Sequence, residues 1–204
     1  SPMRAYVSSA QRKPQLVEAV VALAARTEPA AITTAAIATE LGLTQGAVFK
    51  HFARKEDIWL AAIEWTAQAL FARLDAAAAA AASPLDALEA MFLAHADFVA
   101  DHPGVPRIVF AELQRPDPTP ARGAARGLME RYVARVADLL AQASAKGQVA
   151  TDFAPHAAAL LFVGALQGLV MQSLITDAPD RLRGAAQDVF AVYRRAVAAS
   201  REVA

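Results

Sequence analysis

Apolar residues recur along most of this chain every three or four positions, the spacing of one face of an α-helix. The apolar–polar alternation of a half-buried strand is nowhere sustained. Capping residues, glycines and prolines divide the pattern into nine predicted helices. Their expected bounds are 11–27, 33–41, 44–52, 55–82, 83–101, 105–113, 121–146, 155–175 and 180–201. The pattern therefore predicts an all-α protein.

The composition agrees with this prediction and narrows the function. Roughly a quarter of the 204 residues are alanine, the best helix former. The chain has no cysteine, which excludes disulfide scaffolds, thiol nucleophiles and zinc-thiolate sites. We find neither a membrane span nor a signal peptide, so we expect a soluble cytoplasmic protein with no membrane partner.

The charged residues, whose formal charges sum to zero over the whole chain, are unevenly distributed. Residues 1–55 carry seven Lys/Arg and three Asp/Glu, whereas residues 56–204 carry thirteen and seventeen. A basic first quarter favours an anionic partner for that part of the chain. A chance split of this size is the alternative.

The segment from Thr34 to Ala53 has the spacing of a helix-turn-helix. Ala38 is small where the two helices would cross, and Gly42, four residues later, permits the positive φ of the turn. Val48, six residues further on, would be the buried anchor of the second helix. Such a pair places one helix in the major groove of DNA while the other braces on the backbone. A plain helical hairpin is the alternative.

With Val48 inward, the second helix would turn a polar face to DNA. Glutamine reads adenine and lysine reaches guanine or phosphate, while glycine lets the backbone come close. Threonines before the two helices could both cap them and contact phosphates, and cations beyond the second helix suit phosphates across the groove. The predicted DNA-binding residues are Thr33, Thr34, Thr44, Gln45, Gly46, Ala47, Lys50, His51 and Lys55.

Residues 32–60 resemble the signature of the TetR family of bacterial transcriptional regulators. The shared features are a threonine pair, a Leu-Gly turn, an aromatic-x-His-Phe run and a following lysine and glutamate; here they are Thr33-Thr34, Leu41-Gly42, Phe49-Lys50-His51-Phe52, Lys55, Glu56 and Leu60. One position departs. The family usually has a tyrosine whose hydroxyl contacts phosphate where this chain has Phe49, so we expect Phe49 to act only as a packing aromatic.

The resemblance implies a homodimer on a palindromic operator. It also implies a helix-turn-helix DNA-binding domain in residues 1–55, and an effector-binding and dimerisation domain in residues 56–204. A close helix approach between subunits is compatible with two glycines four residues apart in a strongly apolar predicted helix. The predicted interface residues are Leu161, Gly164, Gly168, Val189 and Tyr193; an intramolecular core is the alternative.

The predicted middle helices carry methionines and aromatics that suit an adaptable apolar ligand site. The predicted lining is Met91, His95, Phe98, Phe110, Met129, Phe162, Gln167 and Met171. We expect a mid-sized, mostly apolar organic ligand, with His95 and Gln167 as polar contacts. Ordinary core packing is the alternative for this set. No metal-binding spacing such as HExxH is present, and neither a metal nor a cofactor is expected.

These features favour a one-component regulator, most simply a repressor that a ligand releases from its operator. A DNA-binding factor without a small-molecule effector has the same sequence features. A helical enzyme using His95 with Asp97 or Asp101 is the third hypothesis; we expect no enzyme, because no nucleophile–base ordering and no phosphate-binding loop is visible. The sequence leaves open the operator, the ligand and the direction of regulation.

Overall fold

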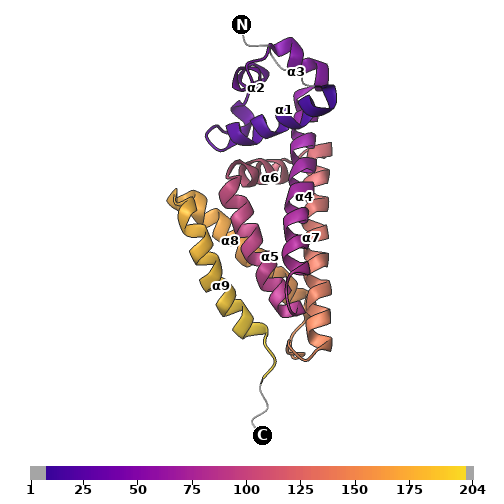
Figure 1. Cartoon of the computed structure of the whole chain (residues 1–204), viewed down its shortest axis with the longest axis vertical. Coiled ribbons are helices and arrows are strands. Elements are labelled where there is room, and N and C mark those ends of the chain that lie inside the picture. Colours follow the sequence, from indigo (N-terminus) through magenta and orange to yellow (C-terminus); the bar gives the residue numbers. More distant parts are fainter. Residues whose placement is uncertain (1–7, 201–204) are drawn as a thin grey trace. The chain divides into compact units, whose positions relative to one another are not determined.

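The structure of the chain, a computed structural model, describes residues 8–200 (Figure 1). This part of the chain contains nine α-helices, two short 3-10 helices and one isolated antiparallel bridge between Val149 and Ala198. The α-helices are α1 (Ser9–Ala24), α2 (Thr34–Glu40), α3 (Gln45–His51), α4 (Lys55–Ala79), α5 (Pro84–Asp101), α6 (Gly104–Gln114), α7 (Pro120–Ala145), α8 (Pro155–Thr176) and α9 (Leu182–Val197). The predicted all-α architecture of nine helices is confirmed.

The helix ends follow local capping chemistry, with small shifts from the predicted bounds. Helix α1 begins earlier than expected because the backbone N–H of Ser8 donates to the Gln11 side chain (3.3 Å), which leaves Pro14 inside the helix. The Ser83 hydroxyl accepts from the backbone N–H of Asp86 (3.1 Å) and so caps α5. The 3-10 helices η1 (Pro29–Ala31) and η2 (Pro179–Arg181) were not anticipated; each has proline at its first position.

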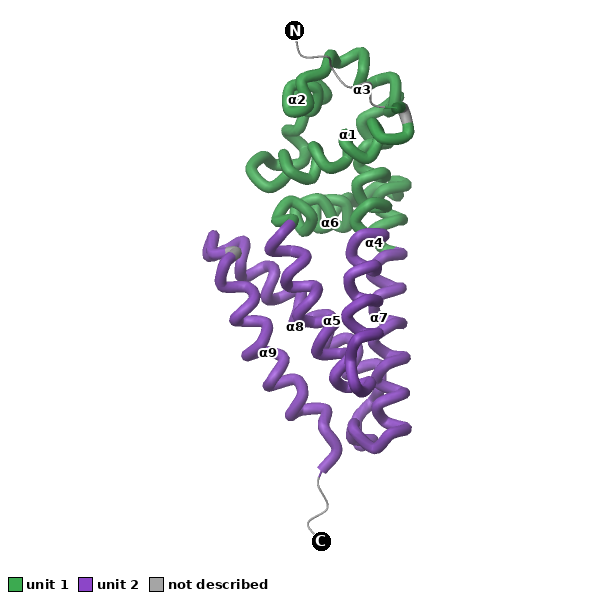
Figure 2. The backbone as a smooth tube through the Cα atoms, in the orientation of Figure 1, with its two compact units in different colours: residues 1–67, 102–126 green, residues 68–101, 127–204 purple. Residues whose placement is uncertain are grey.

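The chain divides into two compact units, coloured separately in Figure 2. The first holds the residues up to 67 together with 102–126, and the second holds 68–101 together with the residues from 127 onward. Helices α4 and α7 therefore contribute to both units, and α6 belongs with α1–α3. The domain boundary at residue 55 stays a prediction, since the two compact units are defined by contacts and do not follow the chain order.

In the first unit, α1 packs against α2 and α6. Leu16, Val20 and Ile37 are almost fully buried there. Gly104 lies at the point where α6 meets α1: an added Cβ would stand 2.1 Å from the Val21 carbonyl oxygen and 2.9 Å from the Ala25 nitrogen. The two helices thus touch backbone to backbone, which only glycine permits.

In the second unit, aromatic rings from α5, α7, α8 and α9 form one buried cluster. Its members are Phe92, Tyr132, Phe162, Phe190 and Tyr193, with neighbouring ring centroids 5.2–6.3 Å apart. The Tyr193 hydroxyl donates to the Ala158 carbonyl (2.8 Å), and burial raises the pKa of that hydroxyl. The cluster stabilises the contact of α5 with α8 and α9.

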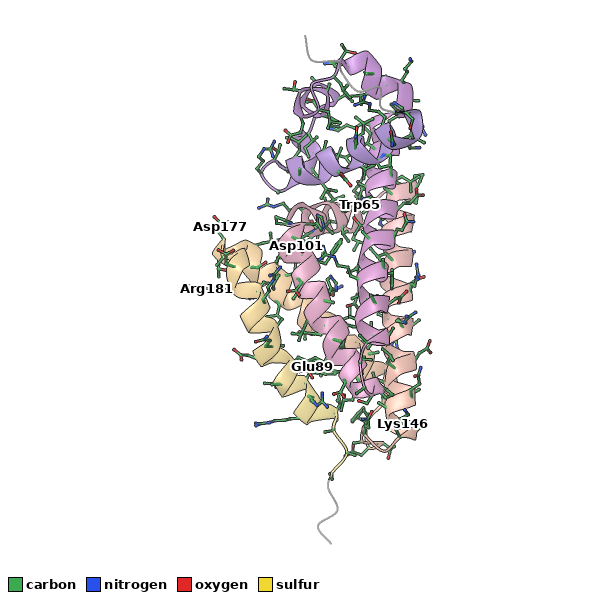
Figure 3. All side chains as sticks on the ribbon, viewed as in Figure 1. Trp65, Glu89, Asp101, Lys146, Asp177 and Arg181 are labelled. Atoms are coloured by element: carbon green, nitrogen blue, oxygen red, sulfur yellow. The ribbon has the colours of Figure 1, made fainter. Side chains whose placement is uncertain are left out.

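Two arginines of α9 clamp the outer edge of α5. Arg183 contacts Asp97 at 2.7 Å and Asp101 at 3.1 Å. Three turns later, Arg194 contacts Asp86 and Glu89, each at 2.9 Å. Figure 3 labels Glu89 and Asp101, one from each clamp. The hydrogen bond from Arg194 is the main cause that lowers the pKa of Asp86.

Helix α8 is more apolar than the sequence reasoning allowed. Its 22 residues and mean hydropathy of 1.9 make it, by length and composition, the one helix of the described chain that could cross a membrane. The prediction that no segment is apolar enough was therefore wrong, because α8 carries no Asp, Glu, Lys or Arg. Only 33% of its most apolar window is buried, so much apolar surface on α8 is uncovered.

Candidate DNA-binding surface and ligand site

Helices α2 and α3 form the predicted helix-turn-helix. Between them, Gly42 has φ +63°, and the next residue, Leu43, donates its backbone N–H to the Ala38 carbonyl (2.8 Å). A Cβ at Gly42 would meet nothing within 4 Å, so the backbone conformation, and not space, requires glycine there. Ala38 and Val48 are buried as predicted. The turn holds the two short helices in a fixed pair.

Threonine hydroxyls begin both helices. The Thr33 Oγ1 accepts from the Ala36 N–H (3.0 Å) and the Thr44 Oγ1 accepts from the Ala47 N–H (3.3 Å). Each cap satisfies one of the backbone donors at a helix start. Each hydroxyl keeps its own hydrogen for an outside acceptor such as phosphate. Thr34 is the first residue of α2 and is half-buried.

The outward face of α3 carries the predicted reading residues. Gln45, Gly46 and Lys50 are exposed, while Ala47 and His51 are half-buried. A Cβ at Gly46 would meet only the Thr44 Oγ1, at 3.9 Å. Nothing within the described chain therefore requires glycine at position 46, which leaves that part of the helix open to a close approach from outside.

Phe49 corrects one expectation. It does not pack; its side chain is 48% exposed beside Lys50. The inward positions of this end of α3 are taken by Val48 and Phe52, and each step along a helix turns the side chain by about 100°. Phe49 thus adds an exposed ring to the candidate DNA surface, which the sequence reasoning missed.

Two lysines of this unit have internal contacts. The Lys55 Nζ donates to the Ala30 carbonyl (3.3 Å) and lies 6.0 Å from the centre of the Trp59 ring, so the first residue of α4 is tied to η1. Lys13, which was not predicted, lies over the Phe52 ring at 5.2 Å. Because an ammonium has three donors, Lys55 retains donors for a phosphate.

The predicted ligand residues have unlike surroundings. Met91, Phe98 and Phe162 are fully buried in the packed core. Met171 is 41% exposed on the outside of α8, and Phe110 belongs to the other compact unit. Sequence spacing could not reveal these differences, because a methionine or aromatic on a helix faces core, pocket or solvent with the same periodicity. Within the second unit, the half-buried members are His95, Met129 and Gln167.

His95 and Tyr132 form a polar pair in the second unit. The His95 Nδ1 lies 2.9 Å from the Tyr132 hydroxyl. Burial lowers the pKa of His95 to about 4 and raises that of Tyr132, so both are neutral at pH 7. Asp97 and Asp101, the acids of the enzyme hypothesis, are ion-paired with Arg183. The nearby Gln167 amide donates to the Met129 sulfur (3.2 Å).

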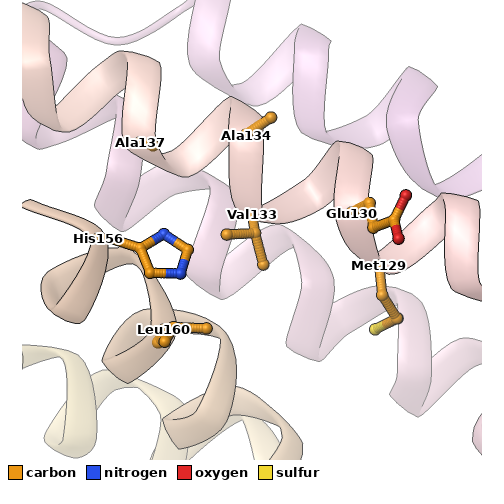
Figure 4. A pocket seen from close by; sticks show the side chains of 7 residues that line it. All are labelled: Met129, Glu130, Val133, Ala134, Ala137, His156 and Leu160. Atoms are coloured by element: carbon orange, nitrogen blue, oxygen red, sulfur yellow. The ribbon is translucent and has the colours of Figure 1, made fainter.

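An open hollow of about 500 Å³ lies between α7 and α8 of the same unit (Figure 4). It is lined by Met129, Glu130, Val133, Ala134, Ala137, His156 and Leu160. Apart from Met129 the sequence did not predict this set, because its members are mostly apolar and come from two helices whose contact the sequence does not specify. Within residues 8–200, no three His, Asp or Glu side chains are grouped as a metal site would require.

The predicted dimer residues divide into two groups. Leu161, Gly164 and Gly168 are exposed on α8, and a Cβ at either glycine would meet nothing within 4 Å. On α9, by contrast, Val189 is half-buried and Tyr193 is buried against Ala158. Tyr193 therefore faces its own chain, and it is Val192 that lies on the exposed face.

Two family profiles match this chain. Residues 16–62 match "Bacterial regulatory proteins, tetR family", and residues 81–171 match "Tetracyclin repressor-like, C-terminal domain". The chain belongs to the TetR family of bacterial transcriptional regulators. The helix-turn-helix above is the part of a TetR-family protein that the first profile describes.

Individual relatives are distant in sequence, and those with solved structures are similar in fold. The nucleoid occlusion factor SlmA of Marinomonas sp. (strain MWYL1) is 26% identical over 101 residues, so the match spans about half of each protein (50% of this chain, 51% of the other). A transcriptional regulator from Saccharomonospora viridis, solved with choline, is 19% identical at a TM-score of 0.80 and the match covers 94% of this chain and 100% of that one. The FadR regulator of Bacillus subtilis, solved with stearoyl-CoA, is 17% identical at a TM-score of 0.77, and the match covers 88% of this chain and 96% of that one.

Proposed function

We propose that this protein is a cytoplasmic dimeric repressor that binds a palindromic operator through α3 and is released by a small, mostly apolar ligand. The observation that carries the proposal is the capped helix-turn-helix with its outward face of Gln45, Gly46 and Lys50. Family membership supports the DNA-binding part. The proposal includes no catalytic activity, since Asp97 and Asp101, the carboxylates of the enzyme hypothesis, are ion-paired with Arg183.

A stripe along α8 supports dimerisation. Its exposed apolar or small positions recur at alternating intervals of four and three residues; they are Ala157, Leu161, Gly164, Gly168, Met171 and Ile175. This is the repeat of a helix that packs along its length against another helix. The stripe lies on the part of α8 that the chain itself leaves uncovered.

The two glycines of this α8 stripe strengthen the argument. Glycine inside a helix costs about 1 kcal/mol relative to alanine. Gly164 and Gly168 stand in front of open space, so no contact within the described chain explains them. A second copy crossing α8 at these glycines would, by two-fold symmetry, place Leu161 of each chain against Met171 of the other. Val192, exposed on α9, would extend the same surface.

Two observations bear on the ligand. The relatives solved with stearoyl-CoA and with choline bind chemically unlike molecules on one fold, so the fold does not select the ligand. In this chain, the half-buried polar residues His95 and Gln167 lie among apolar side chains. This setting favours an organic ligand with a large apolar part and few polar atoms.

A DNA-binding factor without an effector is the second candidate. It is favoured by the closed packing of Met91, Phe98 and Phe162, which leaves these predicted walls without accessible surface. A thermal-shift screen distinguishes the two candidates, because a ligand that binds only the folded protein raises its stability.

The deciding experiment is selection of bound fragments from a random DNA pool by the purified protein, at about physiological salt. We expect a palindrome whose half-sites are separated by about one helical turn or more. Recovery of single half-sites would contradict the dimer. If no motif is recovered, the selection is repeated after the protein is unfolded and refolded to remove any bound ligand. A second failure would overturn the proposal that the protein is a sequence-specific regulator.

A further inference from the structure

The hollow between α7 and α8 adjoins the proposed dimer stripe. Two of its lining residues on α8, His156 and Leu160, are exposed, and each comes directly before a stripe residue, Ala157 or Leu161. In Figure 4 the His156 ring points from α8 toward α7. Leu160 leaves 51% of its surface exposed although it faces the apolar α7 wall of the hollow. The hollow thus continues the uncovered apolar surface of α8 onto α7.

The exposed surface of α8 runs obliquely across the helix. Each residue turns the side chain by about 100°, so His156 and Leu160 lie on one flank of the stripe, toward α7. Further along the helix, the exposed residues beside the stripe are Gln172 and Thr176, which lie on the opposite flank. On the α7 flank of that second half, Leu174 is half-buried. The uncovered band therefore starts on the α7 side of α8 and ends on its other side.

A two-fold axis between Gly164 and Gly168 brings the two ends of this band together. It pairs Leu160 of one chain with Gln172 of the partner subunit, because both positions are equally far from the axis. The flank that is exposed at the start of one α8 then meets the flank that is exposed at the end of the other. Two identical helices that cross at an angle need bands of this kind to cover each other. Such a crossing carries the last turn of the partner's α8 over the hollow.

The last turn of α8 has side chains that suit the hollow. Ile175 is the most exposed large apolar side chain of α8, at 68%, and no contact within the described chain covers it. Asp177 follows this turn and is also exposed. Its carboxylate and the last carbonyls of the helix are acceptors, whereas the His156 imidazole at the rim of the hollow can donate. The turn and the hollow therefore match in apolar surface and in polarity.

We propose that the hollow between α7 and α8 receives the last turn of α8 from a second copy of this chain, so that α7 belongs to the dimer interface. Ile175 of the partner subunit lies against the apolar lining, and His156 faces the partner's Asp177. By symmetry a dimer contains two such contacts. The inference rests on the proposed dimer and extends it, since the α8 stripe and Val192 involve only α8 and α9.

The test is cysteine cross-linking of the full chain, which has no cysteine of its own, so only introduced thiols react. Gln172→Cys is combined with Ala134→Cys, an exposed position in the α7 wall of the hollow. Leu161→Cys with Met171→Cys tests the α8 stripe by itself. The control combines Gln172→Cys with Gln68→Cys, because Gln68 is exposed on α4 of the same compact unit and does not line the hollow.

A link from the hollow to position 172 reports on two chains and not on one. Gln172 follows Leu160 by twelve residues on one helix, which places it about 18 Å from the hollow of its own chain. A short bismaleimide does not span that distance. Denaturing electrophoresis separates linked dimers from single chains, and sedimentation equilibrium gives the oligomeric state before linking.

We expect the Ala134→Cys, Gln172→Cys protein to form linked dimers at least roughly tenfold faster than the control, because thiols held close together react at a high effective concentration. Rapid linking of the Leu161→Cys, Met171→Cys protein alone overturns this inference, keeps the proposed dimer and leaves the hollow to another occupant such as a small molecule. If neither protein links faster than the control and the unaltered chain sediments as a monomer, the proposed dimer is overturned as well.

Discussion

A buried neutral histidine makes the stability of this protein depend on pH. An unfolded histidine has a pKa near 6.5, whereas burial lowers that of His95 to about 4. Between these values the unfolded state binds the proton and the folded state does not. The contribution of His95 to stability is therefore present above about pH 6.5 and is lost as the pH falls toward 4.

The expected loss is about 3 kcal/mol of unfolding free energy between pH 7 and pH 4. Denaturant unfolding at several pH values should show a slope of the unfolding free energy against pH, and His95→Phe should reduce that slope. His156→Phe is the control, because His156 is exposed. Equal slopes in the unaltered protein and in His95→Phe would show that His95 is not protected from protonation.

Substitutions of single residues, Lys50 and Thr44, test the predicted DNA-contacting face of α3. In the proposed complex, the exposed Lys50 side chain would contact base edges, whereas the Thr44 hydroxyl would contact phosphate. We expect Lys50→Ala to weaken operator binding by about tenfold and to relax the sequence preference, and Thr44→Ala to weaken binding to all sequences alike.

Fluorescence anisotropy with operator and scrambled DNA measures both effects. Lys146→Ala is the matched control: Lys146 is also exposed and follows α7 in the second compact unit (labelled in Figure 3). If Lys50→Ala binds both DNAs as the unaltered protein does, then the reading face lies elsewhere on the protein.

At the scale of elements, the contact of α1 with α6 depends on one missing side chain. A Cβ at position 104 would lie 2.1 Å from a backbone oxygen of α1, and backbone atoms cannot turn aside as a side chain does. Gly104→Ala should therefore destabilise the protein by about 1–3 kcal/mol as the helices are forced apart.

Gly123→Ala gives a control with the opposite sign. Gly123 lies in α7, within the same compact unit, and its added Cβ would meet nothing within 4 Å. Because alanine is the better helix former, this variant should gain about 0.5–1 kcal/mol. Urea unfolding compares the two. Equal stability of both variants would mean that α1 and α6 do not touch in solution.

At the scale of the whole molecule, the proposed α8 stripe predicts the oligomeric state. In the isolated chain, side chains at positions 164 and 168 have room, so larger residues should leave the fold intact. Between two chains they would block the close crossing. We expect Gly164→Leu with Gly168→Leu to raise the dimer dissociation constant by at least roughly tenfold.

Sedimentation equilibrium measures this change. Gly127→Leu is the matched control, since Gly127 is also an exposed helical glycine with open space, on α7. Circular dichroism should show equal helix content in all three proteins. An unchanged dimer in the double α8 variant would place the interface away from the glycines.

Local sequence signals determined the helices and the turn of the DNA-binding head. The positive φ of Gly42 and the caps at Thr33 and Thr44 depend on residues within four positions of one another, so the printed sequence contains all of their causes. These predictions were confirmed because their physics is short-ranged.

The tertiary structure alone decided which positions of α8 and α9 are covered. Tyr193 turned inward because Ala158, 35 residues earlier, offers its hydroxyl an acceptor, and Met171 turned outward because the chain leaves that side of α8 bare. Gly104 is required by Val21, far away in the sequence. Helical periodicity specifies that a face is apolar, but what covers that face depends on partners that only folding brings near. The site residues that the sequence misplaced are those whose roles depend on such distant contacts.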